Sequence, residues 1–389
     1  MDPIKNPFTP GAGCPPHELA GRGEVLEEAR ILLGRTIRRK PEKSMLLTGL
    51  RGVGKTVLLN TMEQEAITQG YRTIIFEVNE AQGLGVKLVP ALRNLMFELD
   101  RIQGSKEFVK RGLMILRNFV GSIKMNYGDF GVELDPLPGI ADTGNLEIDL
   151  PDLFLCVAEA AKAKGTGVAL FIDEIQLLKT EELAGLIMAM HKLQQKQAPF
   201  VLIAAGLPTL PRLAGDAKSY AERLFSYPII GQLQRAEADE ALQIPAASEN
   251  ADFSPDALAE IYQYTQGYPY FLQEWGYQVW KLAEGHHITL ADVQAAEKIV
   301  TQRLDMNFFR VRYDRLTDGE KRFMQAMAFC KLPCRSSDIA EKLGMKLSAL
   351  TPMRANLIRK GMIYSPRHSL LDFSVPLFDL FLKRNSSLV

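Results

Sequence analysis

Eight consecutive residues in the first quarter of the chain could bind phosphate groups. They fit the pattern G-x-x-x-x-G-K-[ST] and read Gly49-Leu50-Arg51-Gly52-Val53-Gly54-Lys55-Thr56. An apolar strand is expected just before them, at 44–48, and a helix just after them, from Val57 onward. In that setting the glycines let backbone N–H groups wrap around phosphates, and the helix N-terminus adds positive potential. We therefore expect Lys55 to reach the outer phosphates of a nucleotide and the Thr56 hydroxyl to join the shell of a Mg²⁺ ion.

Two carboxylates follow another apolar run, roughly 110 residues downstream. Residues 168–172 predict a buried strand, and Asp173 and Glu174 come directly after it. Phosphoryl hydrolysis needs one carboxylate beside the metal ion and another beside the attacking water, so we assign Asp173 to the metal and Glu174 to the general base. The guanine-reading string N-K-x-D does not occur in the sequence, which favours adenine. A P-loop kinase is the alternative, but a Glu directly after the metal-binding Asp fits water activation better.

The elements that must position these residues form an alternating pattern. Five short apolar runs, separated by helical patterns, occur at 44–48, 73–78, 168–172, 200–205 and 227–233. Continuously apolar strands between helices indicate a parallel sheet that is covered on both faces. The predicted fold class is therefore α/β, a P-loop nucleotide-binding core over residues 1–235. Between the second and third runs, 88–120 is expected to be helical, and 123–148 a hairpin or irregular part of an insertion at about 100–150.

Two smaller domains are expected after the core. Residues 236–305 have a helical pattern without strand signals, which predicts a helical lid. Residues 310–389 predict a winged helix-turn-helix domain, with helices at about 336–343 and 348–360 and a two-stranded wing over 362–375.

Together these features resemble the AAA+ superfamily, in particular origin-recognition-like initiators and related archaeal-type ATPases. The resemblance rests on the segment Leu19-Ala20-Gly21-Arg22-Gly23-Glu24, the two motifs above, the helical lid and the terminal winged helix. It implies that Gly21 and Arg22 lie against the adenine of ATP. It also implies an arginine near the start of the last core strand that reaches the γ-phosphate bound by a neighbouring subunit. Arg223 fits that place, with Arg212 as a weaker candidate and a structural surface ion pair as the alternative for Arg223.

Two departures from the family pattern indicate slow turnover. The fourth strand ends at Ala204-Ala205-Gly206, without the Asn, Ser or Thr that usually helps to position water. In the lid, the usual Arg is replaced by Gly267-Tyr268-Pro269-Tyr270, which resembles the STAND class of signalling ATPases. That second resemblance implies that Pro269 approaches the adenine. The chain then suits a slow, nucleotide-dependent switch.

Charge distribution suggests a partner for the C-terminal domain. From Arg310 to Val389 the chain has 15 Lys plus Arg against seven Asp plus Glu, so this part carries +8 and the rest −8. A basic module joined to an acidic body favours double-stranded DNA as the partner of residues 335–367, with docking to a protein as the alternative. The resemblance also allows a homo-oligomer.

Composition limits the remaining possibilities. With 47% hydrophobic and 24% charged residues, the chain has the composition of a folded globular protein. The N-terminus has no secretory pattern and no apolar run approaches the ~18 residues of a membrane span, so we expect a cytoplasmic protein without a membrane partner. The leading hypothesis is an ATP-driven switch that binds or remodels DNA. Its rivals are a STAND-like signalling or defence ATPase and an assembly factor with negligible turnover.

Overall fold

The structure, a computed structural model, describes residues 1–11, 13–79, 82–100, 106–122, 139–367 and 369–385. Its contacts divide the chain into two compact units. The sheet unit consists of Glu24–Thr48 and Lys55–Ile229, and the lid unit consists of Met1–Gly23, Gly49–Gly54 and Ile230–Val389. Of the predicted phosphate loop, Gly49–Gly54 belong to the lid unit, whereas Lys55 and Thr56 begin a helix of the sheet unit.

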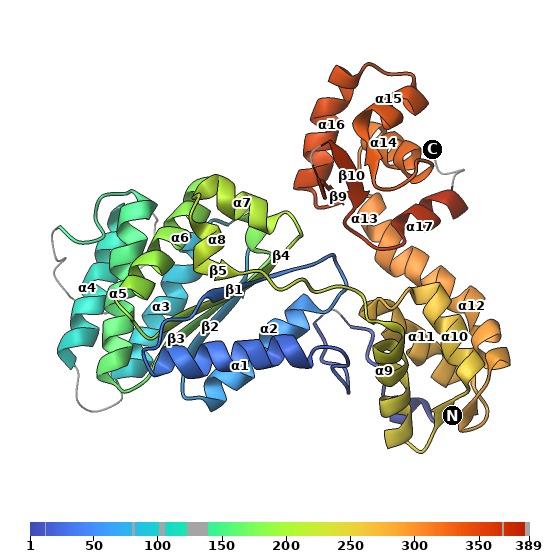
Figure 1. Ribbon diagram of the computed structural model, residues 1–389, viewed down its shortest axis with the longest axis horizontal. Helices are drawn as coiled ribbons and strands as arrows, with labels where there is room; N and C mark the ends of the chain where they lie inside the picture. The colour runs from blue at the N-terminus through green and yellow to red at the C-terminus, as the bar shows by residue number, and fades with distance from the viewer. Residues whose placement is uncertain (12, 80–81, 101–105, 123–138, 368, 386–389) are drawn as a thin grey trace. The chain divides into compact units, whose positions relative to one another are not determined.

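A five-stranded parallel sheet forms the centre of the sheet unit, in the order β2-β3-β4-β1-β5. Helices cover the sheet on both faces (Figure 1), which confirms the predicted α/β fold. The strands are β1 (Ser44–Thr48), β2 (Arg72–Glu77), β3 (Val168–Asp173), β4 (Phe200–Gly206) and β5 (Phe225–Ser226). The first four lie within one residue of the predicted runs.

Burial along the central strands explains why the sequence shows continuous apolar runs. All residues of β1, β3 and β4 are buried. Alternate residues such as Leu46, Leu170 and Leu202 join the large core cluster beneath α3 to α6, whereas the intervening Phe171 and Ile203 are buried on the opposite face. Since successive side chains of a strand point to opposite faces, a sheet covered on both sides requires apolar residues at every position.

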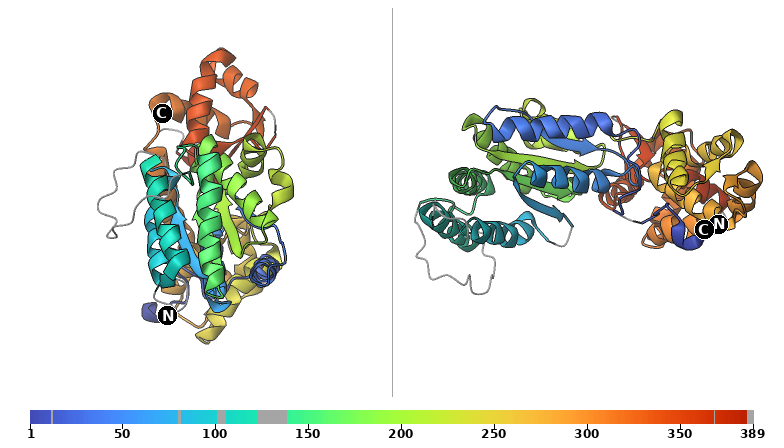
Figure 2. Two further views of the ribbon diagram at one scale, coloured as in Figure 1. Left: turned by 90° about the vertical axis from the view of Figure 1, so that its left-hand side faces the viewer. Right: turned by 90° about the horizontal axis from the view of Figure 1, so that it is seen from below.

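Helices of the sheet unit confirm most of the predicted pattern. Those in the segment before β3 include α4 and α5, which run side by side (Figure 2). The prediction for 123–138 lies outside the described residues; residues 139–145 form turns, and Asn145 caps α5 by accepting a hydrogen bond from the Glu147 backbone N–H. The helices are α1 (Gly23–Ile37), α2 (Lys55–Thr68), α3 (Leu84–Asp100), α4 (Lys106–Ser122), α5 (Leu146–Ala163), η2 (Ile175–Leu177), α6 (Thr180–Gln195), α7 (Leu210–Ala217) and α8 (Ala221–Leu224).

The fifth strand differs from the prediction of 227–233. Strand β5 pairs only Phe225 and Ser226 with the first two residues of β1, and Ile229 makes an isolated bridge to Thr48. Pro228 explains the interruption, because proline has no N–H to donate to a ladder. Its carbonyl instead accepts a hydrogen bond from the Thr48 backbone N–H at 2.9 Å. The predicted strand 227–233 was therefore wrong in both position and length.

Residues 235–304 of the lid unit are mostly helical, as their sequence pattern predicts. An N-terminal 3-10 helix, η1 (Pro3–Lys5), precedes them in sequence, and Phe8 packs in their core beside Phe253 and Trp280. The lid elements are α9 (Arg235–Ser248), β6 (Asp252–Phe253), α10 (Pro255–Thr265), α11 (Pro269–Leu282), β7 (His287–Ile288) and α12 (Leu290–Leu304). Strands β6 and β7 form a short parallel pair that the sequence pattern did not predict.

A continuous helical path leads from the lid into a C-terminal module. The π-helical segment η3 (Asp305–Arg310) and α13 (Val311–Tyr313) follow α12 without a break in helical backbone angles. The module contains α14 (Asp318–Ala328), β8 (Cys334–Arg335), α15 (Ser336–Leu343), α16 (Leu347–Arg359), β9 (Ile363–Tyr364), β10 (Leu370–Phe373) and α17 (Phe378–Arg384). Its three strands form an antiparallel sheet in the order β8-β10-β9. Among the described residues, no helix is both long enough and apolar enough to cross a bilayer.

Candidate functional site

The ends of β1 and β3 bring the key polar side chains of the sheet unit together. Helix α2 begins at Lys55, whose side chain is buried, and Thr56 follows it. Asp173 is the last residue of β3 and is also buried. The Thr56 hydroxyl donates a hydrogen bond to Asp173 Oδ2 at 2.5 Å. Two residues 117 positions apart thus meet at the carboxyl edge of the sheet, where parallel α/β folds bind their ligands.

These two oxygen atoms fit a magnesium ion. Mg²⁺ prefers oxygen ligands, and in nucleotide sites it is bound through one or two protein oxygens together with phosphates and water. Thr56 Oγ1 and Asp173 Oδ2 lie close enough to be neighbouring ligands in such a shell. The structure therefore brings together the two residues that the sequence assigns to the metal.

Glu174, the predicted general base, lies in a tight turn after β3. Its backbone is left-handed, with φ at 53°, which is uncommon for a residue other than glycine. The turn is held by a hydrogen bond from the Glu174 backbone N–H to Asp173 Oδ1 at 2.8 Å and leads into η2. Gln176 Nε2 donates to Glu174 Oε2. The sequence pattern did not predict a role for Gln176, which lies two positions after Glu174.

Within the lid unit, the first six residues of the phosphate loop make several backbone contacts. Gly52 and Gly54 have positive φ angles of 82° and 94°, which glycine adopts without the steric cost of a Cβ. The Gly52 carbonyl accepts a hydrogen bond from the Tyr270 backbone N–H at 3.3 Å. The Arg51 backbone N–H donates to the Ser374 carbonyl at 3.1 Å. Both the lid helix α11 and the C-terminal module therefore touch this loop.

Arg22, which precedes the phosphate loop in sequence, forms a hydrogen bond with it. Its guanidinium Nη2 donates to the carbonyl of Val53 at 3.2 Å and to that of Gly231 at 2.6 Å. Burial lowers the pKa of Arg22, and the charge of Glu237 partly opposes that shift. The neighbouring Gly21 has a φ of 67°, and a Cβ there would lie 2.5 Å from Glu237 Cδ. Pro269, the third predicted adenine contact, is the first residue of α11.

Arg223 lies at the opposite edge of the sheet from Lys55 and Asp173. It is exposed on α8, just before β5, and β5 pairs with the first residues of β1. Because β1 is five residues long, its two ends are separated by about 13 Å at the usual rise per residue. Arg212 is exposed on α7, which follows the carboxyl end of β4. Of the two arginines, Arg223 is thus the one far from the edge that holds Thr56 and Asp173.

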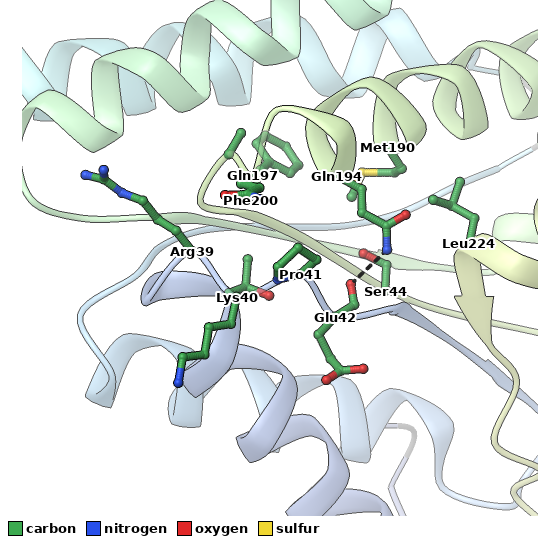
Figure 3. Close-up of a pocket in the computed structure, with 12 residues that line it drawn as sticks. Arg39, Lys40, Pro41, Glu42, Ser44, Met190, Gln194, Gln197, Phe200 and Leu224 are labelled. Carbon is green, nitrogen blue, oxygen red and sulfur yellow. Dashed lines mark hydrogen bonds between the residues drawn. The ribbon is translucent and has the colours of Figure 1, made fainter.

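A pocket occupies this same amino edge of the sheet unit (Figure 3). Its lining includes Arg39, Lys40, Ser44 and Leu224, the residue after Arg223. Gln194 points across it to the backbone of Glu42, with Nε2 at 3.5 Å from the carbonyl oxygen. The pocket is therefore distinct from the edge that holds Thr56 and Asp173.

Comparison with known proteins gives two family matches and several similar structures. Residues 18–203 match the family described as AAA ATPase domain, and residues 306–382 match a family described as a domain of unknown function, DUF8462. No curated protein sequence matches the chain. The Walker-type ATPase PABY2304 of Pyrococcus abyssi has a similar structure, with a TM-score of 0.59 at 15% identity, covering 94% of this chain and 96% of that one.

Two further solved structures are more distant. The ORC1 protein of Aeropyrum pernix, solved in complex with DNA, has a TM-score of 0.45 at 13% identity over 95% of this chain and 94% of that one. The RuvB Holliday junction branch migration motor of Thermotoga maritima has a TM-score of 0.43 at 15% identity over 93% and 96%. Residues 18–203 are thus similar to an AAA ATPase domain, and the chain shares its fold with a Walker-type ATPase.

Proposed function

We propose that this chain is an ATP-binding and ATP-hydrolysing AAA+ switch. The observation that supports this most strongly is the 2.5 Å hydrogen bond between Thr56 and Asp173, with Lys55 and Glu174 next to them in sequence. A hydroxyl, a buried carboxylate, a lysine and a second carboxylate at one sheet edge are the groups that phosphoryl transfer to water requires.

In this proposal each residue has a distinct role. Backbone N–H groups of residues 49–56 and the Lys55 ammonium hold the phosphates, while Thr56 and Asp173 would hold Mg²⁺. The bound ion would offset the negative charge that builds up on the phosphate oxygens. Glu174 accepts the proton of the attacking water. Turnover is expected to be slow or stimulated by a partner, because the sequence has Gly206 where a polar residue usually positions that water.

Phosphate release from purified protein tests this proposal. Loss of a general base typically lowers a rate by ~10²- to 10⁴-fold, so Glu174→Gln should bind ATP normally but release phosphate at least ~10²-fold more slowly. Glu181→Gln is the matched control, since Glu181 is an exposed acid of α6 in the same unit. A wild-type protein that binds ATP without releasing phosphate would instead support the assembly-factor hypothesis.

Gly21, Arg22 and Pro269 are proposed to bind the adenine end of ATP. Gly21 and Arg22 adjoin the phosphate loop through the Arg22 hydrogen bonds, and Pro269 directly precedes Tyr270, whose N–H bonds to Gly52. Substituting Pro269 by Ala should weaken binding of ATP more than binding of inorganic triphosphate, because only ATP carries the base. Equal losses for both ligands would argue against a contact with adenine.

Arg223 is proposed to act on ATP held by a second copy of the chain. Its place at the far edge of the sheet suits action in trans, where such an arginine is worth ~10³-fold or more in rate. Arg223→Ala and Lys55→Ala should each be inactive alone, yet a mixture of the two should recover activity at sites that combine an intact loop with an intact arginine. No recovery, together with a wild-type rate for Arg223→Ala, would leave Arg223 as an ordinary surface residue.

The C-terminal module is proposed to be a winged helix-turn-helix that binds double-stranded DNA through residues 335–367. Helix α16 buries Leu350 and Leu357 on one face, while Arg359 is exposed, as is Arg367 between β9 and β10. With the excess of eight positive charges over residues 310–389, this arrangement suits a recognition helix and a backbone-contacting wing.

A gel shift on duplex DNA, with and without ATP, tests this part of the proposal. Affinity should fall steeply between about 50 and 200 mM salt, and each lost phosphate contact should reduce the slope of log K against log salt by about 0.9. Arg359→Ala and Arg367→Ala should both weaken binding, whereas Lys298→Ala, an exposed lysine of α12, should not. Salt-insensitive or undetectable binding in both nucleotide states would exclude the DNA role.

One observation favours a second candidate, a STAND-like signalling ATPase whose winged helix binds a protein. The phosphate loop bonds to the C-terminal module through Arg51 and Ser374 and to the lid through Gly52 and Tyr270. Such contacts would let the nucleotide state change the position of the module without any role for DNA. A negative gel shift combined with ATP-dependent protection of the module from proteolysis would favour this candidate.

A further inference from the structure

At the end of β4, the side chain of Gln176 occupies the space beside Gly206. The sequence pattern alone does not reveal this arrangement. At Gly206 the strand lacks a polar side chain, but the space beside it is filled by the side chain of Gln176. The Gln176 Oε1 atom accepts a hydrogen bond from the Leu207 backbone N–H at 3.1 Å. Its Nε2 atom donates to the carboxylate of Glu174. The amide therefore connects the proposed general base with the end of the neighbouring strand.

Chemistry fixes the direction in which this amide points. A carboxylate accepts hydrogen bonds and a backbone N–H donates them, so Nε2 must face Glu174 and Oε1 must face Leu207. The bond to the carboxylate is charge-assisted, which makes it stronger than one between neutral groups. Both partners thus hold the half-buried Gln176 in one rotamer, and Gln176 in turn holds Glu174.

The backbone explains why Gln176 can reach both groups. Strands β3 and β4 are adjacent and parallel, with Ile172 opposite Ala204, so Glu174 and Gly206 emerge at the same edge. The left-handed turn at Glu174 leads directly into η2, and the Leu177 backbone N–H closes it on the Glu174 carbonyl at 2.9 Å. This one turn brings Gln176 back against the end of β4.

Gly206 and Gln176 depend on each other sterically. A Cβ at Gly206 would lie 2.7 Å from Gln176 Oε1 and 3.1 Å from Leu210 Cδ2. Any side chain at position 206 must therefore displace the Gln176 amide. Because Gly206 has no side chain, the amide can occupy this space. The backbone of Gly206 does not have a positive φ, so this steric conflict, rather than backbone strain, is what a larger residue would meet.

We propose that Gln176 is the positioning residue for Glu174, and that it takes over from the polar side chain that β4 lacks. This inference rests on the proposed ATP hydrolysis and goes further by naming how its general base is oriented. Gln176 fixes the carboxylate of Glu174 and couples it to the backbone of Leu207. A base that is misplaced by about 1 Å can lose ~10²-fold in rate, so a single amide can control turnover while leaving nucleotide binding intact.

Single substitutions test the positioning role. Gln176→Met keeps the length of the side chain but removes both hydrogen bonds, and kcat for phosphate release should fall ~10- to 100-fold while KM and the Kd for ATP change less than ~2-fold. Gln176→Ala should behave in the same way. Gln194→Ala, a half-buried glutamine of α6 at the other edge of the sheet, is the matched control and should keep the wild-type kcat.

A double variant supplies a readout that a purely structural role would not give. Gly206→Asn alone should lower kcat, because its side chain collides with Gln176. Combined with Gln176→Ala, the same substitution enters the vacated space with an amide of its own, and kcat should rise at least ~5-fold above that of Gln176→Ala. If the two substitutions lower kcat additively in the double variant, Gln176 does not take the place of a polar side chain at position 206.

The outcomes separate this inference from the proposed function. If Glu174→Gln abolishes phosphate release while both Gln176 variants keep the wild-type kcat, the positioning role is wrong and the ATPase proposal stands. If wild-type protein releases no phosphate, both are wrong. If a Gln176 variant loses ATP affinity to the same degree as kcat, Gln176 is a structural residue and the positioning role is wrong.

Discussion

Gly267 in the lid offers a direct test of how tightly this unit is built. It follows the C-terminus of α10 with a φ of 74°, and its carbonyl accepts a hydrogen bond from the Leu233 backbone N–H at 2.8 Å. A Cβ at this position would lie 2.1 Å from the Leu233 carbonyl oxygen and 3.2 Å from Tyr262 Cε2. Steric crowding alone therefore explains why a glycine occupies position 267, whether or not a nucleotide binds nearby.

The expected cost of Gly267→Ala combines two effects. A left-handed backbone costs an L-residue about 1–2 kcal/mol, and overpacking costs about 1–3 kcal/mol, so the lid should lose about 2–5 kcal/mol of stability. Gly267→Asn separates the two effects, because Asn tolerates the left-handed region but still carries a Cβ. It should cost only the overpacking part, about 1–3 kcal/mol. Gly285→Ala, with no positive φ and nothing within 4 Å of its Cβ, should stay within about 1 kcal/mol of wild type.

Tryptophan fluorescence measures this effect in the lid alone. The chain has two tryptophans, Trp275 and Trp280, and both lie in α11 just after Gly267. Urea titration followed by their emission reports the unfolding of the lid. A Gly267→Asn protein that unfolds at the wild-type midpoint would refute the reasoning, since it would show that the contact with Leu233 is not tight.

Two further predictions follow from the lid unit. Burial would raise the pKa of Glu320, but hydrogen bonds from Lys360 and Thr317 outweigh burial and lower the pKa. The pair of Glu320 and Lys360 therefore stabilises the folded C-terminal module at pH values above 4.5, the ordinary pKa of Glu. This stabilisation is lost as the pH falls through the lowered pKa. Glu320→Gln should flatten the acid limb of a stability-against-pH curve measured by circular dichroism; an unchanged limb would contradict the lowered pKa. Arg22→Ala removes two hydrogen bonds to backbone carbonyls near the phosphate loop and should weaken ATP binding ~10-fold or more, measured by titration with a fluorescent analogue, whereas an unchanged Kd would show that Arg22 does not support the loop.

The core of the fold could be predicted because its signals are local. Strands β1, β3 and β4 are buried on both faces, so each appears as a continuous apolar run. The bounds of these three strands and of β2 lie within one residue of the predicted runs. The prediction of the last strand was wrong because Pro228 interrupts the hydrogen bonds to β1 within an apolar stretch that extends to Leu233. The parallel pair β6-β7 is only two residues long on each side, which is too short for any alternating pattern to be visible.

The candidate site could be predicted where a motif with polar residues directly follows a predicted strand. Thr56 and Asp173 could be paired from sequence, because parallel strands deliver their carboxyl ends to one edge of a sheet. Gln176 could not be assigned in this way, because its role depends on the space above Gly206, which only the packing of η2 against β4 creates. The contacts of Arg51 with Ser374 likewise join residues more than 300 positions apart.

Nucleotide titration of wild-type protein and Lys55→Ala tests the central claim most directly. If the loop 49–56 binds a triphosphate, wild type should bind a fluorescent ATP analogue in a Mg²⁺-dependent manner, and Lys55→Ala should lose at least ~10-fold in affinity, since a hydrogen bond to a charged group contributes about 1.5–3 kcal/mol. Lys87→Ala, a substitution of a lysine on α3, should bind like wild type. An unchanged affinity for Lys55→Ala would contradict the assignment of this loop as the phosphate site.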